Sequence, residues 1–414
     1  MSVELQEMLE SGRHTLSWDE AASAAVDLRH AVDKKKQRSV RLALSFAAIA
    51  VYADLYTTQP ILPILSREFH VTASVAGLTI SILVLMIALM SAAYGFLSDT
   101  LGRKPVMVWS CALLVIPTLL CAVAPTFKVL LVFRALQGLL IPGVTAVAVA
   151  YLGDSYAEAD LGPRVGGWIA ASVAGGLTGR VFGGLLASWI HWRAPFVFFG
   201  LWTLLGAIAL ARTIPPRQRA GNVRGGLAFR GMFGHFRNRR LLGSFVIGAG
   251  VFFATIGVFT YLPYYLSAPP FNLSTAVISS LYLIYVVGVL TSLVSGQIAK
   301  RVPVRTLMGI GLVISALGVI ITRISVLAVV LLGLAVLCVG MFTVQAIAPT
   351  FVNRTASAAK GGAGALYVSF YYLGASVGSS VPGYAWQIWG WWGVVATCVG
   401  ALSIALLADI ILCR

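Results

Sequence analysis

Three ionisable side chains lie inside otherwise apolar segments of this sequence. Asp54, Arg134 and Arg180 each fall within a separate long apolar run. A charge at the centre of a bilayer costs roughly 2.5–3.5 kcal/mol on insertion scales unless it is paired or hydrated. A lone carboxylate in such a place can gain and lose a proton as its surroundings change, which is the chemistry of a proton relay. We therefore predict that Asp54, Arg180 and Arg134 form a proton-coupling group.

The depths of these charges suggest which of them can meet. Counted along a helix at ~1.5 Å per residue, Asp54 lies about 20 Å from the predicted cytoplasmic surface and Arg180 about 24 Å. Arg134 is a competing cation at a slightly shallower level. The Asp54–Arg180 pair is either a static lock within one half of the molecule or a switch in which the carboxylate takes up a proton when the pair separates.

The first predicted helix offers two different polar faces. Asp54 shares one face with two threonines, whereas Tyr52, Tyr56 and Gln59 lie on the opposite side. Either Asp54 turns toward a central cavity, or the tyrosines do and Asp54 faces a neighbouring helix such as the one that carries Arg180. The predicted cavity-lining residues are the polar and aromatic side chains Tyr52, Tyr56, Gln59, Phe253, Thr255, Tyr261, Gln345, Tyr371 and Tyr372.

Composition identifies the elements that must position these residues. The chain has 414 residues, of which 59% are apolar and 11% charged, and its mean hydropathy is +0.90. These values exclude an ordinary soluble globule, and long continuous runs favour helices over the alternating strands of a membrane barrel. Twelve runs are long enough to span a bilayer: 42–64, 76–97, 105–124, 129–151, 166–189, 194–213, 242–266, 275–298, 304–322, 325–349, 362–385 and 390–412. The predicted fold is an all-α integral membrane protein of twelve transmembrane helices.

The basic residues indicate how the helices are oriented. The net charge is +16, but Lys and Arg cluster between apolar runs and not along one polar face, so nucleic acid is not an expected partner. Most of them fall on one side of the predicted bundle, which the positive-inside rule makes cytoplasmic. The sequence thus predicts a multi-pass protein of a bacterial-type inner membrane, with both termini in the cytoplasm and the lipid bilayer as its surroundings.

Four regions follow from the charge pattern. Residues 1–40 form a polar cytoplasmic tail with seven of the fourteen acids, in which Ser17-x-x-Glu20 resembles a capping box before an amphipathic helix that either lies on the membrane or is solvated. Residues 41–213 are a six-helix half, 214–240 a basic connector with seven arginines, and 241–414 a second six-helix half. Both halves start on the same side, so the repeat is parallel.

A loop motif after the second predicted helix carries a family resemblance. The segment Gly95-Phe-Leu-Ser-Asp99-Thr-Leu-Gly102-Arg103-Lys104-Pro105 resembles the inner-loop signature of the major facilitator superfamily. Its glycines permit tight turning, Asp99 can cap or pair locally, and the two cations anchor the turn at the membrane surface. The matching turn of the second half has Lys300 in place of the acid and Pro303 in place of the later glycine. Any contact of this motif that holds one transport state closed is therefore expected mainly in the first half.

Two helix motifs extend the resemblance. Arg134-Ala-Leu-Gln137-Gly138 resembles the fourth-helix motif of the superfamily, and the fifth-helix antiporter motif is matched by glycines that include Gly175, Gly179 and Gly183. Arg180 stands where the antiporter pattern has proline, which is similar to the YnfM-like branch of the drug:proton antiporter families. The Gly-x-x-x-Gly pairs of both halves would suit a helix interface that opens and closes. The resemblance covers almost everything from residue 40 onward and implies the major facilitator fold.

Several classes of protein are not indicated. The five cysteines lie in or beside apolar segments without ligand spacing, and no phosphate-binding loop or nucleophile–base set is present, so we expect no enzyme, no metal and no cofactor. The resemblance and the buried charges favour a monomeric secondary transporter that exports small amphipathic or drug-like compounds in exchange for protons. A porter for an anionic or sugar-like solute is the alternative, because two buried arginines face one buried acid. A non-transporting membrane sensor or scaffold is a third possibility.

Overall fold

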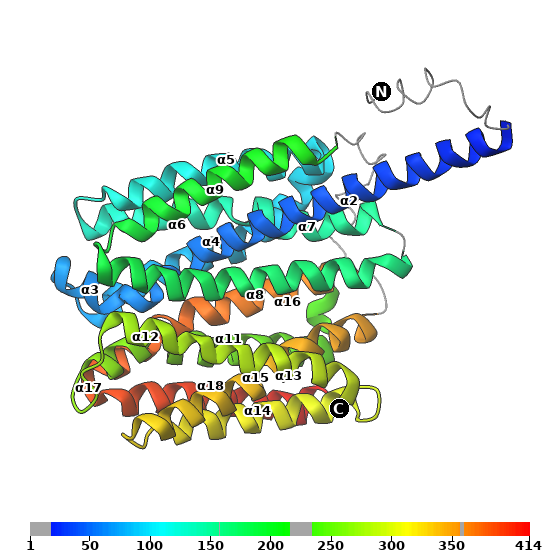
Figure 1. The fold of residues 1–414 in the computed structure, drawn as a ribbon. Helices are drawn as coiled ribbons and strands as arrows, with labels where there is room; N and C mark the ends of the chain where they lie inside the picture. Colours follow the sequence, from blue (N-terminus) through cyan, green and yellow to red (C-terminus); the bar gives the residue numbers. More distant parts are fainter. Residues whose placement is uncertain (1–17, 157, 216–233, 357–359) are drawn as a thin grey trace.

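The described residues form a bundle of long helices. The computed structural model describes residues 18–156, 158–215, 234–356 and 360–414, and all regular structure within them is helical. Eleven helical segments there are long and apolar enough to cross a membrane. The twelfth predicted segment, 362–385, is formed by two shorter helices, α16 (Lys360–Gly378) and α17 (Val381–Trp389). Figure 1 shows the long helices lying side by side along one common direction, which confirms the expected all-α membrane fold.

The first half contains the helices up to residue 213. They are α2 (Trp18–Tyr56), η1 (Gln59–Ile61), α3 (Leu62–Glu68), α4 (Ala73–Leu101), α5 (Arg103–Ala122), α6 (Phe127–Leu140), α7 (Pro142–Ser155), α8 (Glu158–Trp189) and α9 (Ala194–Thr213). The second half begins after the connector, of which 216–233 lie outside the described residues. It contains η2 (His235–Arg237), α11 (Arg239–Ser267), α12 (Thr275–Leu281), η3 (Tyr282–Ile284), α13 (Tyr285–Ile298), α14 (Val304–Ile321), α15 (Leu327–Thr355), α16, α17 and α18 (Trp391–Leu412).

Four predicted spanning segments are interrupted in their course, and proline accounts for three of the interruptions. Pro60 follows the end of α2, Pro142 begins α7, and Pro382 lies in the first turn of α17. Proline lacks the N–H group that would continue the helical hydrogen bonds, so a helix ends before it or begins at it. In the segment 275–298, the turn η3 separates α12 from α13 without a proline.

The two ends of the bundle differ, and we name them by what they carry. The α3 end bears α3 and the start of α18, at the left of Figure 1. The Arg103 end, at the right, bears the turn between α4 and α5 and the C-terminus. The helix α2 extends beyond the bundle at this end, because it runs without interruption from Trp18 into the first spanning segment. The predicted tail at 1–40 therefore ends within a helix; residues 1–17, including Ser17 of the expected capping box, lie outside the described part.

The two halves repeat the same close helix contact. Gly179 of α8 lies against the backbone of α2 at Ala53, and Gly378 of α16 lies against the backbone of α11 at Phe253. The offsets are 253 − 53 = 200 and 378 − 179 = 199 residues, so the two pairs are counterparts. A β-carbon at either glycine would collide with these backbones. The Gly-x-x-x-Gly pairs thus hold each half together, which corrects the expectation that they form the interface that opens and closes.

Candidate functional site

Hydrogen bonds join the two halves from the α3 end to the middle of the bundle. Ser81 of α4 and Ser376 of α16 bind each other reciprocally: Ser81 Oγ donates to Ser376 O at 2.7 Å, and Ser376 Oγ donates to Ser81 O at 3.0 Å. Toward the α3 end, Tyr264 Oη donates to Leu62 O at 3.0 Å. Further links at this end are Gln59–Thr260, Ser66–Tyr264 and Ser74–Gln387. The halves are therefore closed on each other at the α3 end.

The same helices are less crowded at the Arg103 end. Gly95 of α4, Gly166 of α8 and Gly364 of α16 have no described atom from outside their own helix within 4 Å of the position of a β-carbon. On the α3 side, by contrast, Gly77 of α4 lies against Ser379 of α16, and Gly184 of α8 lies against Ser279 of α12. The contact between the halves is thus asymmetric along the bundle.

Asp54 is fully buried in the first half. Its Oδ2 accepts hydrogen bonds from Thr203 Oγ1 of α9 at 2.9 Å and from Thr118 Oγ1 of α5 at 3.3 Å. Its Oδ1 has no hydrogen-bond partner among the described residues. Because Thr118 Oγ1 also donates its single hydrogen to Leu114 O at 2.8 Å, the two threonines satisfy the hydrogen-bonding capacity of this buried carboxylate only partly.

Arg134 is also fully buried, and it binds backbone oxygens. Its Nη1 donates to Asp54 O at 2.9 Å, its Nη2 to Leu55 O at 2.9 Å, and its Nε to Thr79 O at 3.0 Å. The helix α2 ends at Tyr56, so the carbonyls of residues 54 and 55 lack the helical N–H partners that a longer helix would supply. In a bilayer such groups must be satisfied within the protein, and Arg134 does this.

A chain of hydrogen bonds connects Arg134 with the Asp54 carboxylate. Arg134 Nη1 donates to Gln137 Oε1 at 2.8 Å, and Gln137 Nε2 donates to Thr118 Oγ1 at 2.8 Å. Thr118 in turn contacts the carboxylate. The fourth-helix motif Arg134–Gln137 is thus linked to Asp54 through one threonine. The position 200 residues after Asp54 is Ala254, so the carboxylate has no acidic counterpart in the second half.

Arg180 lies between the halves in a cage of tyrosines. Its guanidinium carbon is 3.7 Å from the ring centre of Tyr56, 4.6 Å from that of Tyr285 and 5.7 Å from that of Tyr282. Its Nε donates to Gln59 Oε1 at 2.6 Å, and its Nη1 donates to Gly176 O at 3.0 Å. The side chain is 4% exposed. Aromatic faces stabilise the cation, but no carboxylate of the described residues pairs with it.

The expected ion pairs are therefore not formed in this structure. Asp54 faces α5 and α9, away from the second half, whereas Arg180 faces Gln59 and the tyrosines. Arg134 contacts the backbone of Asp54 and not its carboxylate. Equal depth did not place Asp54 and Arg180 together, because Asp54 leaves α2 on the side of α5 and α9, whereas Arg180 reaches from α8 to the side of Tyr56 and Gln59. Of the two arrangements expected for this helix, the tyrosines face the centre and Asp54 faces neighbouring helices, though not the helix of Arg180.

The predicted aromatic residues at the centre come from both halves. Tyr371 stacks on Phe252 with ring centres 3.7 Å apart, and Tyr372 meets the same ring edge-on. These three residues of the second half pack against the hydrophobic core of the first. Tyr52 of α2 lies next to Tyr372 across the interface. Tyr52, Tyr56, Gln59, Tyr371 and Tyr372 are thus brought together between the halves.

The remaining predicted cavity residues lie elsewhere. Thr255 is buried and donates to Val251 O at 2.8 Å, and Tyr261 Oη donates to Ser379 O at 2.7 Å near the closed α3 end. Phe253 supplies the backbone against which α16 packs. Gln345 on α15 is partly buried. These four do not join the central tyrosine group.

The inner-loop motif forms a charge cluster at the Arg103 end. Arg103 pairs with Asp99 (Nη2–Oδ1, 2.6 Å) and with Asp154 at the end of α7 (Nε–Oδ2, 3.0 Å), and it also binds Ser98. Gly102 has φ +96°, a region that side chains rarely adopt, so a glycine is needed at this turn. Lys104 follows in the first turn of α5. The motif thus ties α4 and α5 to α7 within the first half.

The other motif glycines serve close helix packing. Gly138 of α6 lies against Leu83 of α4, and Gly183 of α8 lies against Thr57. Gly175 lies against α2 at Ile49. These contacts position Arg134 and Arg180, whose side chains leave the same two helices.

Sequence reasoning missed several partners. Thr118 and Thr203 could not be recognised as partners of Asp54 from the sequence, because threonines are common in membrane helices. Tyr282 and Tyr285 have the spacing of one helical face, which could have indicated them. Asp154 ends an apolar run beside a glycine and could have been proposed as the partner of Arg103. No group of residues that could hold a metal ion occurs in the described part of the chain.

This architecture, two matched helical halves around a polar interface, is that of a multi-pass secondary transporter. The chain belongs to the Major Facilitator Superfamily, whose family model matches residues 44–379. It is a membrane transporter and not an enzyme.

Two bacterial relatives illustrate the assignment. The chain is 35% identical to the inner membrane transport protein YnfM of Escherichia coli K12 over 370 residues, which cover 89% of each chain. It is 31% identical over 371 residues to the uncharacterized MFS-type transporter YybF of Bacillus subtilis 168, covering 89% of this chain and 92% of the relative. The similarity to YnfM agrees with the branch indicated by Arg180.

Solved structures show the same fold. A bacterial homologue of the human lysosomal transporter Spinster, in an inward-facing and unoccupied conformation, superposes with a TM-score of 0.78 at 18% identity, covering 91% of this chain and 98% of that one. A D-xylose-proton symporter gives a TM-score of 0.72 at 17% identity, covering 89% and 96%. At these identities the likeness concerns the fold.

Proposed function

We propose that this protein is a proton-coupled secondary transporter that exports small amphipathic compounds from the cytoplasm by alternating access of its two halves. The observation that carries this proposal is the fully buried Asp54 carboxylate, which forms no ion pair with a described residue and is bound on one oxygen only by two threonines. A carboxylate in that setting can exist in protonated and ionised forms that differ in the contacts they favour.

The interface between the halves supports an amphipathic substrate. Tyr52, Tyr56, Tyr371 and Tyr372 offer apolar ring faces together with hydroxyl groups. Rings with a polar edge can contact compounds that are apolar over most of their surface and polar at one point. The close contacts at the α3 end and the open glycines at the Arg103 end support an inward-facing state, with the Arg103 end and both termini in the cytoplasm of a bacterial-type cell.

A second candidate function is the transport of an anionic solute. Arg180 lies at the interface with no carboxylate of the described chain paired to it, and tyrosines of both halves surround it. An anionic group of a substrate could provide the missing counter-charge. Under this alternative, Arg180 and not the tyrosine surface determines which compounds are accepted.

Proteoliposomes with an imposed pH gradient test these functions. Purified protein is given cationic, neutral and anionic amphipathic solutes, with protein-free liposomes and a protonophore as controls. Gradient-driven flux of amphipathic solutes irrespective of charge supports proton-coupled export of this class, whereas gradient-driven flux confined to anions supports the second candidate. Absence of flux for the whole panel contradicts both and favours a non-transporting sensor or scaffold.

A further inference from the structure

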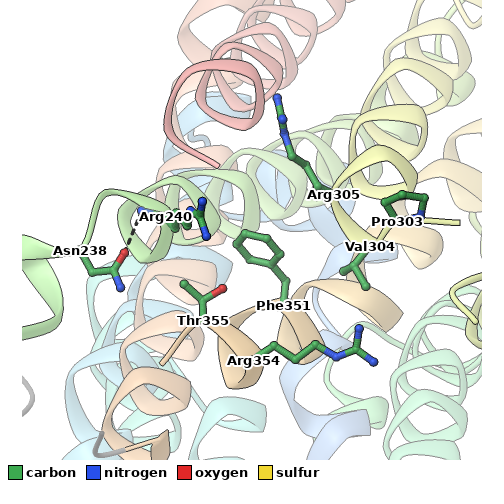
Figure 2. A pocket seen from close by; sticks show the side chains of 8 residues that line it. All are labelled: Asn238, Arg240, Pro303, Val304, Arg305, Phe351, Arg354 and Thr355. Atoms are coloured by element: carbon green, nitrogen blue, oxygen red, sulfur yellow. Dashed lines mark hydrogen bonds between the residues drawn. The ribbon is translucent and has the colours of Figure 1, made fainter. Parts of the chain in front are cut away.

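A pocket far from the central interface lies at the Arg103 end of the second half. It has a volume of about 470 Å³ and opens between the starts of α11 and α14 and the end of α15. Figure 2 shows its lining, which includes Arg240, Arg305, Arg354 and Phe351, with Asn238 and Thr355 as neutral polar groups. The three arginines come from three different helices, and none of the described residues that line the pocket is acidic.

The arginines differ in how many of their donors are already used. Arg354 is exposed and makes no hydrogen bond or ion pair with a described residue. Arg240 uses only Nε, which donates to the backbone oxygen of Arg414 at 2.6 Å. Arg305 is directed toward the end of α18, where its Nε donates to Asp409 O at 3.2 Å and its Nη2 to Ile410 O at 3.3 Å. Arg240 and Arg354 thus keep most of their donors for a ligand.

The nearby acid does not neutralise the pocket. Asp409 Oδ2 is 3.9 Å from Arg305 Nε, and this carboxylate lines a neighbouring pocket on the other side of Arg305. Arg305 therefore stands between the two pockets, with its charge partly balanced. Arg354 has no such acid among the described residues, so its positive charge is not balanced there.

The chemistry of the lining favours a phosphate group. Guanidinium groups offer planar pairs of N–H donors that match the oxygens of a phosphate, and arginines from separate helices can contact different oxygens. The start of α14 has no side-chain cap, so its free backbone N–H groups add to the positive potential. Phe351 supplies an apolar surface beside the cations (Figure 2). Basic pockets between helices at this level of a membrane protein suit anionic headgroups.

We propose that this pocket binds a phosphate group through Arg240 and Arg354, with Arg305 at its rim. The group belongs either to an anionic phospholipid at the membrane surface or to a soluble phosphate ester, since both present the same oxygens. The site lies within the second half, away from the interface between the halves.

Thermal unfolding of the purified full-length protein in detergent tests the proposal, because a ligand that binds the folded state raises the unfolding temperature with its concentration. The probes are phosphatidylglycerol, phosphatidylcholine and glycerol 3-phosphate. The variants are R354Q alone and R240Q with R354Q. The matched control is K300Q with R301Q, which removes two exposed cations at the same end outside the pocket.

At about 1 kcal/mol per basic residue near a membrane surface, we expect the apparent dissociation constant to rise about fivefold in R354Q and about 25-fold in the double variant. The control should change it less than twofold. Stabilisation by phosphatidylglycerol alone identifies a lipid ligand, and stabilisation by glycerol 3-phosphate identifies a soluble one. The proposal would be overturned if K300Q with R301Q weakened ligand binding as much as the pocket variants do. It would also be overturned if R354Q bound phosphatidylglycerol and glycerol 3-phosphate as tightly as the wild type. Arg354 has no hydrogen-bond or ion-pair partner among the described residues, so R354Q remains informative if the double variant does not fold.

Discussion

Arg134 binds Asp54 through the backbone carbonyl, with an Nη1–O distance of 2.9 Å, and leaves the carboxylate to two threonines. The cation is thereby used to complete the hydrogen bonding of a helix end inside the membrane. The Asp54 carboxylate forms no direct ion pair with Arg134. The two side chains are connected instead by hydrogen bonds through Gln137 and Thr118. We propose that Arg134 serves the structure and that Asp54 binds the proton.

This division predicts a structural role for Arg134. We expect Arg134→Gln to destabilise the folded protein by about 3 kcal/mol, because three buried hydrogen bonds to carbonyl oxygens are lost at about 1 kcal/mol each. Thermal unfolding in detergent measures the change, and Arg67→Gln, which removes an exposed arginine, is the control. An unfolding temperature equal to that of the wild type would show that the helix end does not need this cation.

The position of Arg180 predicts an effect on binding and not on pH dependence. We expect Arg180→Gln to weaken binding of anionic solutes at least about tenfold, since a charge-assisted contact is lost, and to leave the pH optimum of transport unchanged. Tyr56→Phe, which retains the aromatic ring over the guanidinium, is the matched control. Solute binding by fluorescence and transport across a pH series provide the two readouts. A shifted pH optimum would indicate that Arg180 and Asp54 communicate.

The sequence was sufficient for the fold because its signals are strong and local. Long apolar runs, basic loops and the Gly95–Pro105 motif each indicate the same twelve-helix architecture, and the structure agrees. The tyrosines Tyr52 and Tyr56 could be assigned to one face by helical spacing alone. The interruptions after Tyr56 and before Pro142 were not predicted, although proline explains them.

The partners of the buried charges could not be derived in the same way. Depth along a helix places Asp54 and Arg180 at one level, but the direction of a side chain depends on how α2 is rotated against α5, α8 and α9. That rotation follows from packing at positions such as Gly179 against Ala53, which a single sequence does not reveal. The role of Arg134 likewise depends on carbonyls freed by the end of α2, three residues before Gln59.

The positive φ of Gly102 predicts that a side chain at this turn slows the change between transport states. A variant in the same motif provides a matched control. We expect Gly102→Val and the smaller Gly102→Ala to slow the interconversion of the two transport states more than they weaken substrate binding, because a side chain is strained by about 1–3 kcal/mol at this φ. Gly95→Ala, in the same motif but with open space around it, is the control. Binding and transport are measured side by side. Equal proportional losses in both would count against a role in the transition.

The reciprocal contact of Ser81 and Ser376 predicts a cross-link that blocks transport. Their Oγ atoms are 2.9 Å apart and belong to different halves. We expect a disulfide between cysteines placed at both positions to stop transport under oxidation, and a reductant to restore it, since the halves must separate at this level. The five native cysteines are buried, and each single variant is the control. Full transport by the cross-linked protein would contradict separation here.

We propose that Asp54 couples transport to protons. The most direct test is Asp54→Asn in proteoliposomes. The amide retains the volume and can accept the hydrogen bond from Thr203, but it cannot release a proton. Concentrative transport driven by a pH gradient is compared with substrate counterflow at equal pH. We expect gradient-driven accumulation to be lost while counterflow persists. Accumulation of substrate against its gradient at the wild-type rate would contradict this proposal.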